Sequence, residues 1–317
     1  MISQVSDTLK RYLQVEPQSV IREIEQFLSE NLHKLKRNGI ILGLSGGLDS
    51  AVVAHLCVQA IGKEKVLCLI MPEKDSEKEH LRDALALART LNVKTKQINI
   101  TPYLKKFGIY RLFPVRKIPT SPKLKKFFIT KGYDFYTHKT GNPPFVDSVL
   151  GIPHATPFSS YLQKGNAYYR LKHRLRMLIL YYYAEQENRL VVGTANKTEY
   201  SIGFFVKYGC DHAADVMPLL HLYKTQVKTV AKYLNIPPRI LNKAPSPDIL
   251  PGLTDEKALG ISYETLDLIL VGLEKGYQVC EIAEALQIKE GKVKSVKDLT
   301  INSGHMRRII DITDKSM

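Results

Sequence analysis

The stretch that decides the fold is Ile40-Ile41-Leu42-Gly43-Leu44-Ser45-Gly46-Gly47-Leu48-Asp49-Ser50. Its apolar beginning is typical of a buried parallel strand. Glycines at 46 and 47 allow a sharp turn in which backbone N–H groups approach a ligand closely, because no Cβ stands in the way. The apolar residues that follow predict a helix over 49–61, and a helix N-terminus attracts anions. The stretch therefore predicts a strand, a phosphate-binding loop and a helix.

Asp49 is the unusual member of this loop, since a carboxylate repels phosphate unless a divalent cation lies between them. Hard oxygen ligands suit Mg²⁺, which keeps substrate phosphates in its coordination shell. The loop lacks the Gly-Lys-[Ser/Thr] ending of a Walker A motif, and it does not match the dinucleotide-binding fingerprint. The plainer interpretation is a strand–turn–helix junction in which Asp49 is a favourable charge at the helix N-terminus.

Strands and helices alternate on both sides of this loop. Apolar residues recur at helical spacing over 17–37, and short apolar runs predict strands over 66–71 and 189–193. A further strand is expected over 93–100. Helices are expected over 76–91 and about 168–187. This alternation predicts an α/β fold with a doubly wound, mostly parallel sheet and helices on both faces. We expect one domain over 1–317, with a helical C-terminal region from about residue 255.

The charge of the chain is concentrated in one segment. The chain has 46 Lys and Arg against 31 Asp and Glu, a net charge of +15. Ten of the basic residues and a single acid, Asp134, lie between Thr101 and Thr140. Four prolines and the lack of a sustained helical period predict an irregular basic insertion over about 105–160. It is either a solvated surface excursion or a cationic lid for polyphosphate ligands or RNA.

Composition excludes several classes of protein. No apolar run approaches the roughly 20 residues of a membrane span, and the N-terminus lacks the apolar centre of a secretory signal. The four cysteines are far apart in sequence and form no CxxC pair. This pattern predicts reduced thiols in a cytoplasmic protein, without a disulfide framework or a zinc knuckle.

The loop over 43–50 resembles the pyrophosphate loop of the N-type ATP pyrophosphatases. Six further blocks resemble ammonia-dependent NAD synthetases, in the order and at the spacing of that family. They are Val191–Glu199, Gly203–Gly209, Ala214–Leu219, Leu222–Val227, Lys243–Asp248 and Thr254–Tyr263. The resemblance covers about residues 17–103 and 165–310.

The resemblance implies a ligase of NAD biosynthesis. Such an enzyme uses ATP and Mg²⁺ to adenylate the carboxylate of deamido-NAD, and ammonia then displaces AMP to give NAD. It also implies a homodimer. The chain shows no nucleophilic Cys near its start, so free ammonia is the expected nitrogen donor, and a separate glutaminase subunit stays open.

Residue roles follow from the same resemblance. ATP would be bound by Gly43, Leu44, Ser45, Gly46, Gly47, Leu48, Asp49, Ser50, Thr194, Lys224 and Ser246. Asp49 and Glu199 would hold the metal. Deamido-NAD would be bound by Arg174, Lys207, Asp215 and His305. Thr194 follows a predicted strand, where ligands bind in open α/β sheets, and a Lys supplies a point charge for phosphates.

Some of these assignments have a structural alternative. Glu199 could be a helix N-terminal charge, Lys207 and Asp215 a surface ion pair, and Arg174 part of a solvated helix face. The chain also departs from the family: residues 209–215 are less glycine-rich than the common form and one residue longer. Met306 stands where a Lys often follows the C-terminal His.

Two other functions remain open from the residues. One is another N-type ATP pyrophosphatase, such as a tRNA-modifying enzyme or a ligase for a different carboxylate. The Cys pairs that thiolating enzymes often carry are absent. The other is a non-catalytic nucleic-acid-binding protein, which would leave Asp49 and Glu199 without a purpose.

Overall fold

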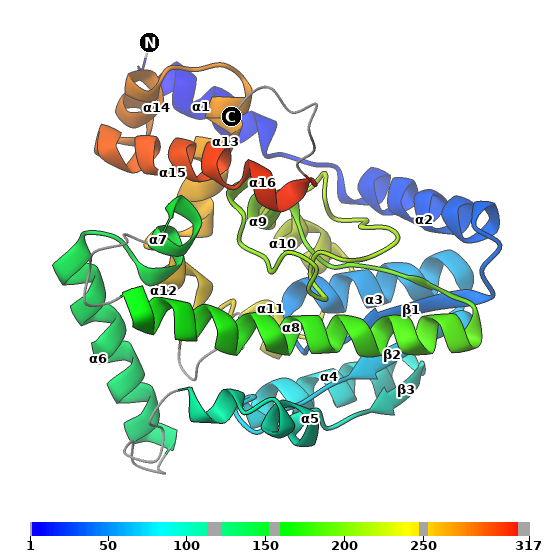
Figure 1. Cartoon of the computed structure of the whole chain (residues 1–317). Coiled ribbons are helices and arrows are strands. Elements are labelled where there is room, and N and C mark those ends of the chain that lie inside the picture. The colour runs from blue at the N-terminus through cyan, green and yellow to red at the C-terminus, as the bar shows by residue number, and fades with distance from the viewer. Residues whose placement is uncertain (1, 113–121, 152–158, 247–252, 310–317) are drawn as a thin grey trace.

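The computed structural model describes residues 2–112, 122–151, 159–246 and 253–309 (Figure 1). Its sheet has four parallel strands in the order β3-β2-β1-β4: β1 (Gly39–Gly43), β2 (Val66–Ile70), β3 (Lys94–Gln97) and β4 (Arg189–Val191). Ile40 pairs with Val66 on one side and with Leu190 on the other. The predicted parallel sheet is therefore confirmed.

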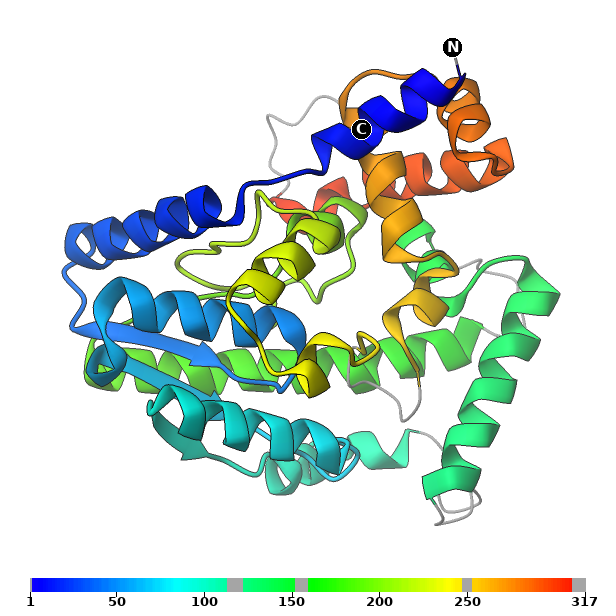
Figure 2. The ribbon, with the colours of Figure 1, turned by 180° about the vertical axis from the view of Figure 1, so that it is seen from behind.

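Helices cover both faces of this sheet, as predicted. On one face Ile40 and Leu42 pack in a core with α2 (Pro17–Lys34), α3 (Leu48–Ile61), α4 (Lys78–Leu91) and α10 (Lys224–Tyr233). On the other face Ile41 packs with α5 (Thr101–Lys106) and the long α8 (Ser159–Glu187). Figure 1 views the molecule from the α8 side and Figure 2 from behind. Successive strand residues point to opposite faces, which explains the continuous apolar run of β1.

The order of the strands creates a crevice. From β1 the chain builds β2 and β3 on one side, and it later returns to place β4 on the other side. The connections that leave β1 and β4 at their carboxyl ends therefore diverge, and open α/β sheets bind ligands at such a switch point. This topology places the loop over 44–50 beside residues 192–199.

The expectation that the basic segment is irregular was wrong. It contains α6 (Pro122–Thr140) and α7 (Pro144–Leu150), and α6 lies at the edge of the molecule in both views. Pro122 begins α6, and Pro102 lies in the first turn of α5, where the missing N–H costs no helical hydrogen bond. These prolines start helices instead of breaking them. Residues 113–121 and 152–158 of the segment lie outside the described residues.

A second core lies among helices of the N-terminus and the C-terminal region. Here α1 (Ile2–Tyr12), which the sequence analysis did not predict, inserts Leu9 between α13 (Tyr263–Glu274) and α14 (Val279–Leu286). The other C-terminal helices are α12 (Asp255–Leu259), α15 (Glu290–Asn302) and α16 (Gly304–Arg307). Shorter elements are α9 (Lys197–Ile202), α11 (Pro238–Leu241) and the 3-10 turns η1 (Lys63–Lys65) and η2 (Ile109–Arg111). No helix of the described chain combines the length and apolar character that crossing a membrane requires.

Candidate active site

The loop after β1 is a tight turn that requires a glycine at position 46. Gly46 has φ +82°, and a Cβ there would lie 2.2 Å from the carbonyl oxygen of His80. The hydroxyls of Ser45 and Ser50 lie 2.9 Å apart, and the Gly47 N–H donates to the Ser45 hydroxyl at 3.2 Å. The loop then enters α3 at Leu48, so its backbone and the helix N-terminus are available to an anion.

The segment after β4 supplies the opposite wall. Asn196 is the N-cap of α9: its side chain accepts from the Glu199 N–H at 3.0 Å, and the Glu199 carboxylate accepts from the Asn196 N–H at 3.4 Å. The Asn196 amide also donates to Asp49 Oδ1 at 3.1 Å. One buried asparagine therefore fixes Glu199 and connects it to the acidic residue of the phosphate loop.

Lys224 joins the two carboxylates. It is the first residue of α10, 5% exposed, and its ammonium donates to Asp49 Oδ2 and, at 3.2 Å, to Glu199 Oε1. The backbone N–H of Lys224 donates to Thr198 Oγ1 at 2.8 Å. Buried Asp267 accepts from both Thr198 and Thr225, which ties α9 to the start of α10.

Burial and charge shift the pKa values of this group. Burial raises the pKa of Glu199, and the Asp49 carboxylate adds to the rise while Lys224 opposes it. For Lys224 burial acts to lower the pKa, but the carboxylates of Asp49 and Glu199 outweigh it and hold the pKa above its ordinary value. Burial raises the pKa of neighbouring Asp255 to about 6. The site thus holds more acid than one lysine can neutralise.

This arrangement fits a magnesium ion. Oxygens of Asp49 and Glu199 already converge on one cationic group. Asp255 accepts from the Tyr263 hydroxyl through Oδ2, whereas its buried Oδ1 has no hydrogen-bond partner among the described residues. Converging carboxylate oxygens are the ligands that Mg²⁺ prefers.

These groups line one cavity of about 250 Å³ at the carboxyl edge of the sheet. The predicted ATP and metal residues that line it are Gly43, Leu44, Ser45, Gly47, Leu48, Asp49, Ser50, Thr194, Glu199, Lys224 and Ser246. Gly46 lies against the backbone of His80 beneath the loop. The structure thus brings together segments that are far apart in the sequence.

The four residues predicted to bind deamido-NAD lie elsewhere. The Lys207 ammonium donates to the carbonyl oxygens of His305 at 2.6 Å and Arg308 at 2.9 Å, and Arg174 Nε donates to the Lys207 carbonyl at 3.3 Å. Asp215 accepts from the Val191 N–H at 2.8 Å and the Tyr181 hydroxyl at 3.1 Å. None of the four is among the described residues that line the cavity. Arg174, Lys207 and His305 form one exposed network beside it.

Two residues that line the cavity, and one that supports its wall, were not predicted from the sequence. Lys243 donates to the Gly46 carbonyl at 3.2 Å and pairs with buried Asp83, and Arg176 Nε donates to the Met71 carbonyl at 3.2 Å. Asn196 had a readable signal, because Asn followed three residues later by Glu is a capping-box pattern. The contacts of Lys243, which lies in one of the family-like blocks, and of Arg176 could not be predicted, since their partners are distant in sequence.

Known proteins are similar to this chain in sequence and in fold. The profile of the NAD synthase family matches residues 20–112 and 152–310 and leaves out 113–151, most of the basic segment. The NH(3)-dependent NAD(+) synthetase of Coprothermobacter proteolyticus is 48% identical over 255 residues, which are 80% of this chain and 84% of the relative. That of Thermotoga neapolitana is 44% identical over 90% of this chain and 93% of the relative.

Solved structures of similar fold belong to related enzymes. An NMN synthetase from Francisella tularensis is 31% identical, with a TM-score of 0.67 over 94% of this chain and 98% of that one. The NH3-dependent NAD synthetase from Campylobacter jejuni, in complex with the nitrate ion, is 26% identical, with a TM-score of 0.65 over 94% and 99%. With its profile match, its relatives and its parallel sheet in agreement, the chain belongs to the NAD synthase family.

Proposed function

We propose that this protein amidates deamido-NAD with ammonia, at the expense of ATP, to give NAD, AMP and pyrophosphate. The observation that carries the proposal is the convergence of Asp49, Glu199 and Lys224 beside the phosphate loop at the switch point of the sheet. The curated relatives, identical at 44–48% of aligned positions, support the substrate and the nitrogen donor.

The chemistry explains why such a site is needed. A carboxylate is a poor electrophile because its oxygen is a poor leaving group. Transfer of the adenylyl group forms a bond from that oxygen to the α-phosphorus and releases pyrophosphate. Ammonia then attacks the acyl carbon, and AMP leaves with the former carboxylate oxygen. Catalysis rests on positioning and on neutralising phosphate charge.

Residues of this chain supply those functions. The loop over Gly43–Ser50 offers backbone N–H groups and two hydroxyls to the phosphates, and Lys224 offers a buried positive charge. Thr194 and Ser246 border the same cavity and would contact ATP. Asp49 and Glu199 would hold Mg²⁺, which when bound supplies charge neutralisation for the phosphate oxygens.

The outer network would hold the second substrate. Arg174 and Lys207 are cations beside the cavity, and deamido-NAD carries a pyrophosphate and a carboxylate, so charge favours its binding there. His305 belongs to the same network. Asp215 lies outside this network and already accepts two hydrogen bonds, so we propose that it supports substrate binding mainly by holding the loop before Val216 against β4.

The proposal includes a homodimer in the cytoplasm. Three exposed apolar side chains follow one face of α6: Leu124, Phe127 and Phe135, which are 47%, 53% and 55% exposed. Such a stripe on an outlying helix suits a contact with a second copy. The four cysteines are free thiols, in keeping with a reducing compartment.

Product analysis tests the function directly. The purified chain is incubated with ATP, Mg²⁺, ammonium and deamido-NAD, and NAD, AMP and pyrophosphate are quantified. We expect equal amounts of the three products and no pyrophosphate without deamido-NAD. Nicotinate mononucleotide, the acid that an NMN synthetase would amidate, and tRNA are the competing substrates. Faster pyrophosphate release with either of them would overturn the assignment, and glutamine in place of ammonium tests the nitrogen source.

A further inference from the structure

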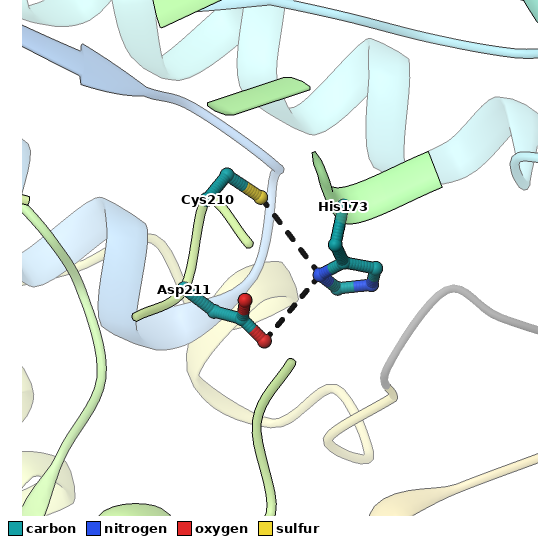
Figure 3. Close-up of side chains that lie close together, drawn as sticks. All are labelled: His173, Cys210 and Asp211. Carbon is teal, nitrogen blue, oxygen red and sulfur yellow. Dashed lines mark hydrogen bonds and ion pairs between the residues drawn. The ribbon is translucent and has the colours of Figure 1, made fainter. Parts of the chain in front are cut away.

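A second cluster of side chains borders the same cavity. His173 comes from α8, whereas Cys210 and Asp211 are adjacent residues of the loop between α9 and α10 (Figure 3). The Nδ1 atom of His173 lies 3.4 Å from Asp211 Oδ2 and 3.8 Å from Cys210 Sγ. Both neighbours thus point to a single ring nitrogen, as the close-up shows.

The backbone holds this cluster in place. The Cys210 N–H donates to the His173 carbonyl at 3.1 Å, and the Val206 N–H donates to Asp211 Oδ2 at 3.0 Å. Gly209 allows the close approach, because a Cβ there would lie 2.7 Å from Asp211 Oδ1 and 2.9 Å from the Cβ of His173. The three side chains are therefore organised by contacts that do not depend on a ligand.

One oxygen of the cluster lacks a partner. Asp211 Oδ1 is buried and accepts no hydrogen bond from any described residue. Buried polar atoms nearly always have a hydrogen-bond partner, so an oxygen without one needs an explanation, and a bound ion is among the common ones. A carboxylate oxygen of Asp211, a ring nitrogen of His173 and the Cys210 sulfur all lie within 4.8 Å of one another, and a thiol and an imidazole are both metal-binding groups.

We propose that His173, Cys210 and Asp211 form a binding site for Zn²⁺ on the wall of the nucleotide cavity. Ligand atoms of a tetrahedral zinc site lie roughly 3.3–3.6 Å from one another, given metal–ligand bonds of about 2.0–2.3 Å. The two separations observed here, 3.4 and 3.8 Å, are close to that spacing. Three protein ligands leave a fourth position for water or for an anionic oxygen of a molecule in the cavity.

The charge of the cluster also suits a divalent cation. Burial acts to lower the pKa of His173, but the Asp211 carboxylate and hydrogen bonds with Asp211 and Cys210 raise it to about 10. Zn²⁺ held by the Asp211 carboxylate, a Cys210 thiolate and the neutral His173 imidazole would form a cluster with no net charge, and binding would release the protons that these ligands carry.

The donor set separates this site from the magnesium site. A thiol and an imidazole suit Zn²⁺ and are poor ligands for Mg²⁺, which takes carboxylates, phosphates and water. Asp49 and Glu199 offer oxygen alone. The same cavity would thus bind two different cations through two separate sets of residues.

The test is metal binding by the full-length chain, stripped of metal with a chelator. Zn²⁺ is titrated in competition with a chromophoric chelator, and Co²⁺ serves as a spectroscopic probe of thiolate ligation. We expect one Zn²⁺ per chain and a thiolate-to-cobalt charge-transfer band. Cys210→Ser should abolish the band and weaken Zn²⁺ binding by more than about 100-fold. Loss of a group that is only hydrogen-bonded to a metal ligand weakens binding by roughly 10–100-fold. Asp211→Asn should weaken binding as well.

Matched controls make the result specific. Cys280→Ser removes the exposed thiol on α14 and should leave both signals unchanged. Asp49→Asn should leave Zn²⁺ binding intact, which separates this proposal from the proposed function. A second measurement uses the unmodified chain, in case a variant does not fold. Bound Zn²⁺ should protect Cys210 from an alkylating reagent, and the mass of the Cys210 peptide reports the extent of alkylation. A cobalt band that persists in Cys210→Ser, or Cys210 alkylation that Zn²⁺ does not slow, overturns the proposal.

Discussion

At the scale of residues, the central feature is one ammonium shared by two carboxylates. Lys224 compensates part of the negative charge of Asp49 and Glu199. Asn196 hydrogen-bonds to both residues and so fixes their positions relative to each other. Binding of Mg²⁺ and ATP would give the carboxylates a second cation and free Lys224 to contact phosphate. We therefore expect the two acids to be required for the reaction and not for the fold.

Asp49→Asn and Glu199→Gln should each lower ATP-dependent amidation by at least about 100-fold, because a neutral amide cannot replace an anionic ligand of a divalent ion. Circular dichroism and thermal unfolding should show an intact fold. Glu264→Gln, on an exposed side chain, is the matched control and should retain normal turnover. Near-normal turnover of both site variants would contradict the metal assignment.

The ion pair between His173 and Asp211 predicts a pH-dependent stability. An unfolded His titrates near 6.5, and the folded residue has a pKa of about 10. The folded state binds this proton more tightly, so the stabilisation is full below about pH 6.5 and is lost as the pH rises to about 10.

His173→Gln should therefore lower the free energy of unfolding by roughly 2 kcal/mol at pH 6, and the difference should shrink toward pH 10. Urea unfolding with a chelator present measures it, and His33→Gln on the exposed side of α2 is the control. A difference that is constant from pH 6 to pH 10 would argue against a charged pair.

The sequence allowed prediction of those site residues that stand in a short local motif. Gly46 and Asp49 stand in one short motif, and the role of Asn196 could have been read from its spacing to Glu199. Asp255 and the cluster around His173 could not be found in this way, because contacts between distant segments create them.

At the scale of elements, the phosphate loop depends on the absence of a side chain at one position. Gly46 and Gly62 both have positive φ, +82° and +81°, but only Gly46 has backbone within reach of a Cβ. Gly62→Ala should cost about 1–3 kcal/mol from backbone strain alone.

Gly46→Ala should cost about 1–3 kcal/mol more than Gly62→Ala, since a Cβ would strike the His80 carbonyl and displace the loop. ATP binding, measured by calorimetry, should be lost in Gly46→Ala and kept in Gly62→Ala. Equal stability and equal ATP affinity in the two variants would show that the loop is not held as the structure has it.

Two helices show where the spacing of apolar residues does and does not predict a helix. The helix predicted over 17–37 is present as α2, because Ile21, Ile24, Leu28 and Leu32 face the core at helical spacing. The helix α6 gave no such signal: it lies at the edge of the molecule, so little of it has to be apolar on one side. Pro122 was read as a helix breaker because its place in the first turn of α6 could not be known from the sequence.

At the scale of the whole molecule, the order β3-β2-β1-β4 places the phosphate loop next to Thr194 and Glu199. Alternation of strands and helices predicted the parallel sheet and its two covered faces. It did not predict the side of β1 on which β4 lies, because that pairing is a contact between distant segments. The roles expected of the distant residues came from the resemblance to NAD synthetases.

The proposed dimer depends on the exposed face of α6. Light scattering at micromolar concentration should give twice the mass of the chain. Phe127→Ser with Phe135→Ser should weaken association by at least about tenfold, because each change removes apolar area from the contact. Tyr233→Ser, on an equally exposed ring of α10, is the control. A fully active monomer, or the same effect from Tyr233→Ser, would contradict this interface.

The central claim is that the phosphate loop and its acids adenylate a carboxylate oxygen. Deamido-NAD labelled with ¹⁸O in its nicotinate carboxylate tests it most directly, with mass spectrometry of the AMP, pyrophosphate and NAD formed in unlabelled water. One ¹⁸O atom should appear in AMP and none in pyrophosphate, because the attacking oxygen leaves with the adenylyl group. AMP without label, or label in pyrophosphate, would show that ATP is cleaved without an acyl-adenylate and would contradict the account.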